Sequence, residues 1–94
     1  METKHLRTFA AIVEMESFTR AGRRLGLSQS AISQQVSALE RHLGVQLLRR
    51  KGSGARPTPA GEVLLQYARQ ILRKLDEAQR VLVDYDSERA GRLR

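Results

Sequence analysis

The sequence predicts a mainly α-helical fold with three short helices, a two-stranded wing and one long helix. Three features of the chain support this prediction. Two short amphipathic segments meet at a sharp turn within residues 18–37. A basic, glycine-containing turn follows a short apolar segment that begins at residue 45. From residue 64 to residue 85 an apolar residue recurs every three or four positions, which is a helical heptad pattern.

Composition limits the possible functions before any motif is considered. The 94 residues make one small domain with room for only a small core. The chain has no cysteine, which excludes a disulfide framework and a thiolate metal site. No apolar run is long enough to span a bilayer, and the N-terminus lacks the apolar stretch of a signal peptide. We therefore expect a cytoplasmic protein that does not bind membranes.

Positive charge is concentrated in the first part of the chain. The net charge of the whole chain is +7. Residues 1–58 hold ten Lys and Arg against four Asp and Glu, and residues 59–94 hold seven against six, so the net charges are +6 and +1. This excess predicts a polyanionic partner for residues 1–58. A basic membrane-binding helix would instead join its charge to apolar bulk on one amphipathic segment.

Three helices are predicted before Gly44. The first runs from residue 4 to about residue 15, where apolar residues recur at i, i+3, i+4 and i+7. Ser17 can cap the start of the second helix, and Gly26 can end it. Ser28 can cap a third helix that runs to about residue 42. Their apolar faces predict one core, formed by Leu6, Phe9, Val13, Phe18, Leu25, Leu27, Ile32, Val36, Leu39 and Leu43.

The opposite side of the third helix carries hydroxyls, an amide and a guanidinium, with no carboxylate. A solvated helix face normally mixes glutamate with lysine, so this face is typical of a recognition helix that lies in the major groove of DNA. The alternative is an ordinary polar surface. The residues of this face are Ser30, Ser33, Gln34, Ser37 and Arg41.

A basic wing is predicted after the third helix. Residues 45–50 form the first strand, residues 51–55 the turn, and residues 56–58 a second strand, which Pro57 confines to an edge. The glycines would let the backbone approach a phosphate or the minor groove, and the cations would attract it. The alternative is a flexible surface loop. The predicted contact residues are Arg50, Lys51, Gly52, Ser53, Gly54 and Arg56.

The long helix begins at Thr58 and Pro59, a hydroxyl cap followed by proline at the first helical position. Residue 61 is glycine, so the capping box is incomplete. The helix should run to about residue 86. A small domain cannot bury so long a seam alone, so we expect a second copy to cover it in a homodimer. The alternative is that the seam packs on the three helices of the same chain, and we expect its first turns to do so, but not all seven positions. The seam consists of Leu64, Ala68, Ile71, Leu75, Ala78, Leu82 and Tyr85.

Four segments carry a specific set of motifs. They read Ser17-Phe-Thr-Arg-Ala21, Leu25-Gly-Leu-Ser-Gln-Ser-Ala-Ile-Ser-Gln-Gln-Val36, Leu39-Glu-Arg-His-Leu-Gly-Val-Gln-Leu-Leu-Arg-Arg50 and Thr58-Pro-Ala-Gly-Glu62. Together they resemble the N-terminal domain of LysR-type transcriptional regulators, and the resemblance covers essentially the whole chain. It implies a winged helix-turn-helix domain that binds partly palindromic promoter DNA as a homodimer with antiparallel linker helices.

The resemblance also implies how the chain is divided. Residues 1–58 would be the DNA-binding domain with its helix-turn-helix motif at 18–37, residues 59–90 the linker helix, and residues 91–94 the hinge to an effector-binding domain that this chain lacks. A small-molecule effector is expected only in that further domain, so no cofactor is expected here. The full-length regulator could pair dimers into tetramers and would be associated with the nucleoid.

By position, the resemblance assigns base reading to Gln29, Ser30, Ser33 and Gln34. It places Thr19, Arg20 and Ser28 near backbone phosphates, and we expect Ser37 and Arg41 to join them. The family often has proline at position 30 and arginine at position 34. Glutamine pairs with adenine whereas arginine prefers guanine, so we expect a changed base preference at one position of each half-site.

No enzymatic activity or metal site is predicted. His5 and His42 lie far apart, and neither has further ligands at a recognised spacing. No motif aims a general base at any serine. Two alternatives to DNA reading stay open: a dimerisation or scaffold module, and another winged-helix repressor that senses a ligand within this chain. RNA is a less suitable partner, because the A-form major groove excludes a reading helix.

Overall fold

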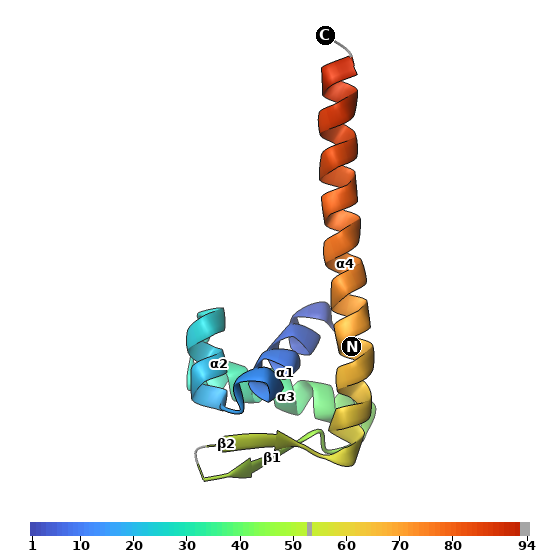
Figure 1. Cartoon of the computed structure of the whole chain (residues 1–94). Coiled ribbons are helices and arrows are strands. Elements are labelled where there is room, and N and C mark those ends of the chain that lie inside the picture. The colour runs from blue at the N-terminus through green and yellow to red at the C-terminus, as the bar shows by residue number, and fades with distance from the viewer. Residues whose placement is uncertain (53, 93–94) are drawn as a thin grey trace.

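A computed structural model describes residues 1–52 and 54–92, with side chains up to residue 86. The elements are α1 (Thr3–Met15), α2 (Phe18–Leu25), α3 (Gln29–Leu43), β1 (Leu48–Lys51), β2 (Gly54–Pro57) and α4 (Pro59–Arg92). Figure 1 shows α1, α2, α3 and the wing gathered into a head, from which α4 rises as a long rod. The molecule therefore measures 58 × 25 × 19 Å. The predicted mainly helical winged helix-turn-helix fold is confirmed.

Local signals set the ends of the short helices, as predicted. The hydroxyl oxygens of Ser17 and Ser28 accept hydrogen bonds from the backbone N–H groups of Arg20 and Ala31, each at 3.1 Å. Gly26 and Gly44 take the left-handed conformation past the ends of α2 and α3, with φ of 69° and 72°.

The end of α4 was predicted too early. The helix continues to Arg92, beyond the predicted end near residue 86 and into the segment that was expected to be a hinge. Gly91 and Arg92 are therefore helical, and Leu93 and Arg94 lie outside the described residues. No helix within the described ranges has the length and apolar character needed to cross a membrane.

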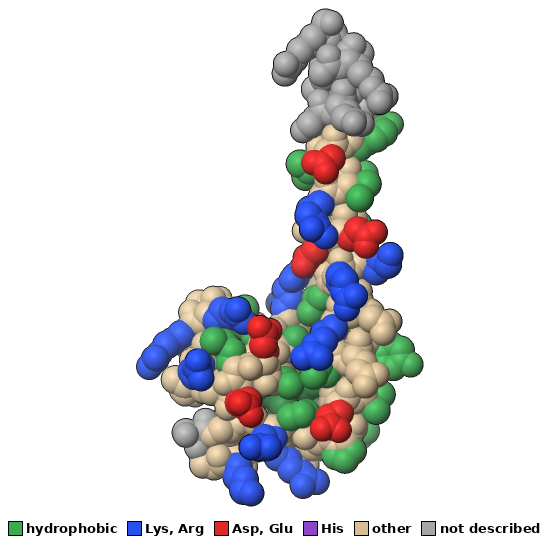
Figure 2. Space-filling model, in the orientation of Figure 1, with side chains coloured by type: hydrophobic (Ala, Val, Ile, Leu, Met, Phe, Trp, Pro, Cys, Tyr) green, Lys and Arg blue, Asp and Glu red, His purple; other side chains and the backbone are tan. Residues whose placement is uncertain are grey.

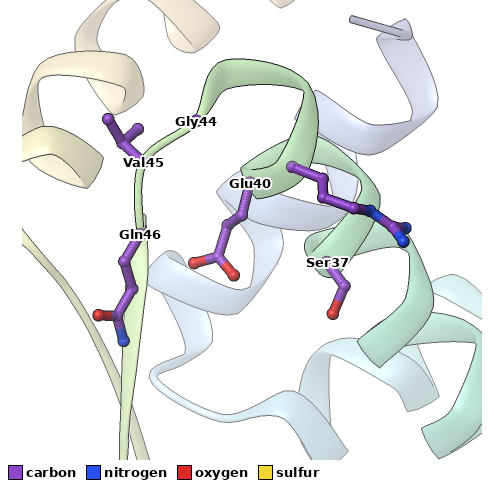
Figure 3. Close-up of a pocket in the computed structure, with 6 residues that line it drawn as sticks. Ser37, Glu40, Gly44, Val45 and Gln46 are labelled. Carbon is purple, nitrogen blue, oxygen red and sulfur yellow. The ribbon is translucent and has the colours of Figure 1, made fainter.

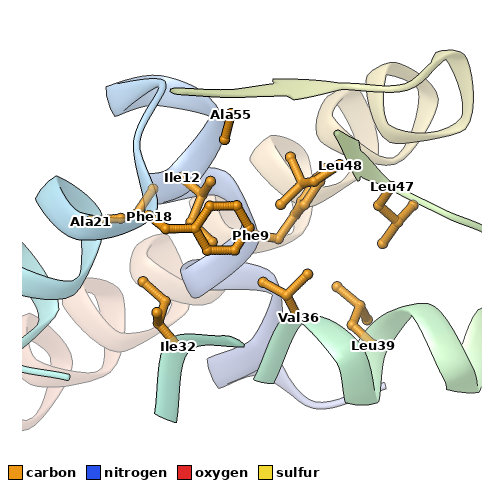
Figure 4. Packing of buried hydrophobic residues seen from close by; sticks show 11 residues of the cluster. Phe9, Ile12, Phe18, Ala21, Ile32, Val36, Leu39, Leu47, Leu48 and Ala55 are labelled. Carbon is orange, nitrogen blue, oxygen red and sulfur yellow. The ribbon is translucent and has the colours of Figure 1, made fainter. Parts of the chain in front are cut away.

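One apolar cluster joins the three short helices to the wing (Figure 4). Phe9 and Ile12 of α1 lie at its centre and are completely buried. The core prediction missed Ile12, and it was wrong for Leu43, which is 36% exposed. Leu43 is the last residue of α3, where the chain turns at Gly44, and Leu47 fills the core instead.

The wing is a two-stranded antiparallel sheet in which Leu48 pairs with Pro57 and Lys51 with Gly54. The first strand begins later than predicted and the second begins earlier. Ser53, predicted at the wing tip, lies outside the described residues. The N–H of Ala55 donates to the carbonyl oxygen of Glu16 at 3.0 Å, which fastens the wing to the end of α1.

Thr58 connects the wing to α4 through three hydrogen bonds. Its N–H donates to the Leu47 carbonyl oxygen at 2.9 Å, and its hydroxyl donates to the Gln46 carbonyl oxygen at 2.6 Å. The same hydroxyl oxygen accepts from the N–H of Gly61 at 3.0 Å, which is the predicted helix cap. A Cβ at residue 61 would overlap the Leu47 carbonyl oxygen. This crowding explains why the capping box lacks its glutamate.

The lower turns of α4 pack on α1 of the same chain. Ala68 is completely buried there, so its assignment to a surface that meets a second copy is wrong for this conformation. Leu64 is half-buried against the core cluster for the same reason. One turn above the packed region, the guanidinium of Arg7 donates to a carboxylate oxygen of Asp76 at 2.9 Å. The head and α4 therefore share one packed junction.

We predict that Gly61→Ala destabilises the domain by about 1–3 kcal/mol, because the new methyl group collides with backbone at the junction. Alanine within a helix would otherwise stabilise by up to about 1 kcal/mol relative to glycine, so the sign of the effect is informative. Gly54→Ala is the matched control, because a Cβ there stands 3.4 Å from its nearest neighbour. Urea denaturation followed by circular dichroism measures both, and equal stability of the two variants would contradict the prediction.

Candidate nucleic-acid interface

The exposed face of α3 is polar and carries no carboxylate. Ser30, Gln34, Ser37 and Arg41 are exposed, and Ser33 is half-buried beside the wing. The face thus combines hydroxyls, an amide and a guanidinium, as the sequence predicted, and these groups can hydrogen-bond to the edges of bases and to phosphates.

Glu40 is the acidic residue of α3, and its half-buried side chain is directed toward the start of the wing. One of its carboxylate oxygens accepts hydrogen bonds from the backbone N–H groups of Leu47 and Leu48, at 2.6 and 3.2 Å. Figure 3 shows the Glu40 side chain directed from α3 toward the segment that carries Gln46. The carboxylate therefore holds the start of the wing against α3, and its negative charge interacts with backbone N–H groups of the same chain. Sequence reasoning did not identify this role, because the two partners are backbone groups.

Arg50 lies between the wing and the helix-turn-helix motif. Its guanidinium carbon stands 3.8 Å from the centre of the Phe18 ring, which is a cation–π contact. One guanidinium nitrogen donates to the hydroxyl oxygen of Ser33 at 2.7 Å. The structure thus places Arg50 beside α3, whereas the sequence grouped it with the wing tip. Ser33 keeps its O–H as a donor, and Arg50 keeps four of its five N–H donors.

The start of α3 is tied to α2 in a similar way. The side-chain nitrogen of Gln29 donates to the hydroxyl oxygen of Thr19 at 2.8 Å. Gln29 keeps its amide oxygen and one N–H for another partner. Arg20 is exposed next to Thr19, and Ser28 uses its oxygen to cap α3. The structure therefore brings these predicted residues to one edge of the helix-turn-helix motif.

The wing adds further positive charge. Lys51 and Arg56 are exposed, as expected, and so is Arg49, which the prediction missed. Gly52 takes a φ of 62°, in the left-handed region, and Gly54 is half-buried. Side chains alternate between the two faces of a β-strand, so Arg49 and Arg50 lie on opposite faces of the wing. The sequence alone could not assign either arginine to a face, because the register of the strand was not known.

No metal-binding cluster is found in the part of the chain that the structure describes, where no three His, Cys, Asp or Glu side chains gather. His42 lies 3.2 Å from the N-terminal amine, through a ring nitrogen. His5 lies 3.2 Å from the carboxylate of Glu2. The two histidines thus contact separate groups.

Fold and exposed face define a winged helix-turn-helix module whose third helix presents a polar surface. Residues 3–62 match the model of the bacterial regulatory helix-turn-helix proteins of the lysR family. The chain therefore belongs to the LysR family, as the motifs in its sequence indicated.

Relatives with known names support this assignment. The chain is 43% identical over 77 residues to the transcriptional regulator BenM of Acinetobacter baylyi, a match that covers 82% of this chain and 25% of BenM. It is 42% identical over 94 residues to the regulator PtxR of Pseudomonas aeruginosa, covering 100% of this chain and 30% of PtxR. The chain thus spans between a quarter and a third of the length of these two regulators.

Solved structures of DNA-binding domains also resemble the chain in fold and in sequence. The DNA-binding domain of BenM, in complex with benA site 1 DNA, has a TM-score of 0.78 and 42% identity, covering 83% of this chain and 91% of that one. The DNA-binding domain of CbnR, in complex with DNA, has a TM-score of 0.80 and 37% identity, covering 97% of this chain and 98% of that one.

We predict that Glu40→Gln destabilises the domain by about 1–2 kcal/mol, because two charge-assisted hydrogen bonds to the wing backbone become weaker neutral ones. Glu14→Gln is the matched control, because Glu14 is exposed and forms only a 3.4 Å ion pair with Arg24. Thermal denaturation measures both variants. Equal melting temperatures would show that the Glu40 carboxylate does not anchor the wing.

Proposed function

We propose that this chain is the DNA-binding part of a bacterial transcription regulator and that it reads duplex DNA with α3 as a homodimer. The observation that carries the proposal is the exposed α3 face, which is free of carboxylates and flanked by Arg50. The BenM and CbnR domains that resemble this chain were solved in complexes with DNA, which supports the same partner. Such a regulator would act on the chromosome, in the cytoplasm.

Affinity and specificity would come from different groups. Cations of the head would bind phosphates and supply most of the affinity, while a few side chains would read bases. The exposed amide of Gln34 suits the paired donor and acceptor of adenine. The O–H of Ser33 remains available to donate to a base acceptor, because Arg50 already binds its oxygen.

The dimer would form through α4, along an apolar stripe that the head leaves uncovered. Toward the head, the stripe includes Val63 and Tyr67, which are 59% and 60% exposed, in place of Leu64 and Ala68. Farther along, its members retain the predicted seam positions. The proposed stripe consists of Val63, Tyr67, Ile71, Leu75, Ala78, Leu82 and Tyr85.

Charge along α4 favours an antiparallel arrangement of the two copies. Residues 59–75 carry Arg69, Arg73 and Lys74 against Glu62, a net charge of +2. Residues 76–92 carry three arginines against five acidic residues, a net charge of −2. Antiparallel pairing brings the basic half of each helix beside the acidic half of the other, whereas parallel pairing opposes like charges.

Titration of fluorescent duplexes at several salt concentrations tests the proposed function. We expect steeply salt-dependent binding to random duplex and tighter binding to sites selected from a random pool. A dimerisation or scaffold module would show no such binding. Footprinting of selected sites would give the half-site and its symmetry, and an asymmetric single half-site would contradict binding as a dimer.

We predict that Gln34→Ala costs about 1–3 kcal/mol on the selected site and little on random duplex, because a base-reading group carries sequence information. Gln35→Ala is not a suitable control, since Gln35 binds Thr8 inside the head, whereas Gln66→Ala alters an exposed amide on α4. Equal loss of affinity on both duplexes would remove Gln34 from the base-reading set.

We predict that Leu82→Asp separates the copies, because Leu82 is 65% exposed on the stripe and dimerisation would bury the new carboxylate. The dissociation constant of the dimer should rise by at least about 100-fold, which is roughly 2.7 kcal/mol. Gln66→Asp introduces the same carboxylate at an exposed position of α4 outside the stripe. Sedimentation velocity at micromolar concentration measures both, and a Leu82→Asp dimer of unchanged affinity would contradict the proposed interface.

A further inference from the structure

Helix α1 connects α4 to α3 within the head. It packs on α2, α3 and α4, whereas α4 packs on the head chiefly through α1 and β2. Figure 1 shows α1 in the middle of the head, beside the lower part of α4. A movement of α4 above its first turns therefore reaches α3 by way of α1.

Two consecutive residues of α1 bind these two neighbouring helices through their side chains. The guanidinium of Arg7 donates to a carboxylate oxygen of Asp76 on α4 at 2.9 Å. The hydroxyl of Thr8 donates to the amide oxygen of Gln35 on α3 at 2.6 Å. Consecutive residues of a helix point about 100° apart, so they can face two different neighbours. A single turn of α1 thus holds polar contacts to both α4 and α3.

The two contacts lie in different environments. Thr8 is 2% exposed, so a broken bond to Gln35 would leave its hydroxyl buried without a partner. The side chains of Arg7 and Asp76 are 41% and 51% exposed, and an exposed ion pair adds little to stability. Figure 2 shows basic and acidic side chains interspersed along the part of α4 that rises from the head.

The position of the ion pair matters more than its strength. Asp76 follows the buried Ala68 by eight residues, which is about 12 Å farther along α4. Arg7 therefore holds α4 at a point beyond its buried contact with α1. A tilt of α4 about that contact displaces Asp76, and Arg7 must follow or release it.

Gln35 bears on the direction of the base-reading side chains of α3. Gln34, proposed to read bases, is the preceding residue, and Gln35 is half-buried against α1. Side-chain ends lie about 5–6 Å from the axis of a helix, so a rotation of about 20° displaces them by roughly 2 Å. Such a displacement breaks a hydrogen bond, whose donor and acceptor stand about 2.7–3.2 Å apart.

We propose that Arg7 and Thr8 are positioning residues for the reading of DNA, through which α1 couples the position of α4 to the rotation of α3. Asp76 and Gln35 are the two ends of this link. The inference rests on the proposed function, and it gives α1 a part in specificity that requires no contact between these residues and DNA.

Thr8→Val tests the link at α3, because valine has nearly the shape of threonine and lacks the donor. The ratio of the affinities for the selected site and for random duplex should fall about tenfold, within the discrimination that one base-reading group supplies. A smaller folded fraction alone would weaken binding to both duplexes equally and leave the ratio unchanged. Thr8→Ser keeps the hydroxyl, so it should keep the ratio within about twofold of the wild-type value.

Asp76→Asn tests the link at α4, and the same ratio should fall about threefold, because a neutral amide holds Arg7 less firmly. Glu77→Gln is the matched control. It removes the same charge from the next residue, where the carboxylate pairs only with Lys74 of α4, at 3.5 Å. The ratio should stay within about 1.5-fold of the wild-type value in this control, because α4 keeps its contact with α1.

The double variant Thr8→Val, Asp76→Asn distinguishes one link from two separate effects. Independent effects multiply, which would lower the ratio about thirtyfold. Both changes interrupt the same link, so we expect a fall of about tenfold, as in Thr8→Val alone.

Backbone amide chemical shifts of the free chain test the coupling without DNA. Asp76→Asn should shift the signals of Gln34 and Gln35, which belong to another helix, whereas Glu77→Gln should leave them in place. This measurement remains decisive if Thr8→Val fails to fold.

Three results would overturn the inference and leave the proposed function intact. They are unchanged signals of Gln34 and Gln35 in Asp76→Asn, an unchanged affinity ratio in Thr8→Val, and a double variant that shows the full product of the single losses. A wild-type chain with no preference for any selected duplex would instead overturn the proposed function, and the chemical shifts would then still decide whether α1 couples α4 to α3.

Discussion

The short segment between α3 and β1 fixes the positions of all the parts that matter for function. The carboxylate of Glu40 holds the N–H groups of Leu47 and Leu48, and the carbonyl oxygens of Gln46 and Leu47 bind Thr58. Helix α3, the wing and α4 thus meet through hydrogen bonds to a few consecutive backbone groups. Buried groups of this kind must be satisfied, so the three elements cannot move independently without losing bonds that water does not readily replace.

The same junction explains the chemistry of the surface that we propose for reading DNA. A carboxylate on the exposed side of α3 would repel phosphates, and Glu40 avoids this by turning inward to a structural task. Arg50 has the complementary arrangement. Its charge stays at the surface, but the Phe18 ring and the Ser33 hydroxyl fix its position before any partner arrives. Fixing a long side chain in the free protein reduces the conformational entropy that binding would otherwise cost.

Local chemistry made much of this fold predictable. Ser17, Ser28 and Thr58 act on backbone groups three residues away, and Gly26 and Gly44 take the conformation that glycine favours, so the starts of α2, α3 and α4 needed only neighbouring residues. Periodicity was less reliable at adjacent apolar positions. It favoured Val13 over the more deeply buried Ile12, because the two positions follow Phe9 by four and three residues and both neighbour it on the helix surface.

Long-range contacts set the features that the sequence did not reveal. The register of the wing depends on the Glu16 carbonyl and the Glu40 carboxylate, and this register decides that Arg49 faces Arg56 while Arg50 faces Phe18. The heptad seam suggested that its first turns pack on the head but not at which residue this packing ends, so Ala68 was assigned to the surface that meets a second copy. The crowding at Gly61 likewise arises from the Leu47 carbonyl oxygen, fourteen positions earlier in the chain.

The uninterrupted course of α4 makes it a lever. Its 34 residues correspond to roughly 50 Å of helix at 1.5 Å per residue. Its angle to the head is set in its first half, by the packing of Ala68 and the ion pair between Arg7 and Asp76. A tilt of about 10° at Ala68 would displace Arg92, which lies roughly 36 Å farther along the helix at 1.5 Å per residue, by roughly 6 Å. Small repacking around a single alanine is therefore amplified into large changes in the reach of the rod.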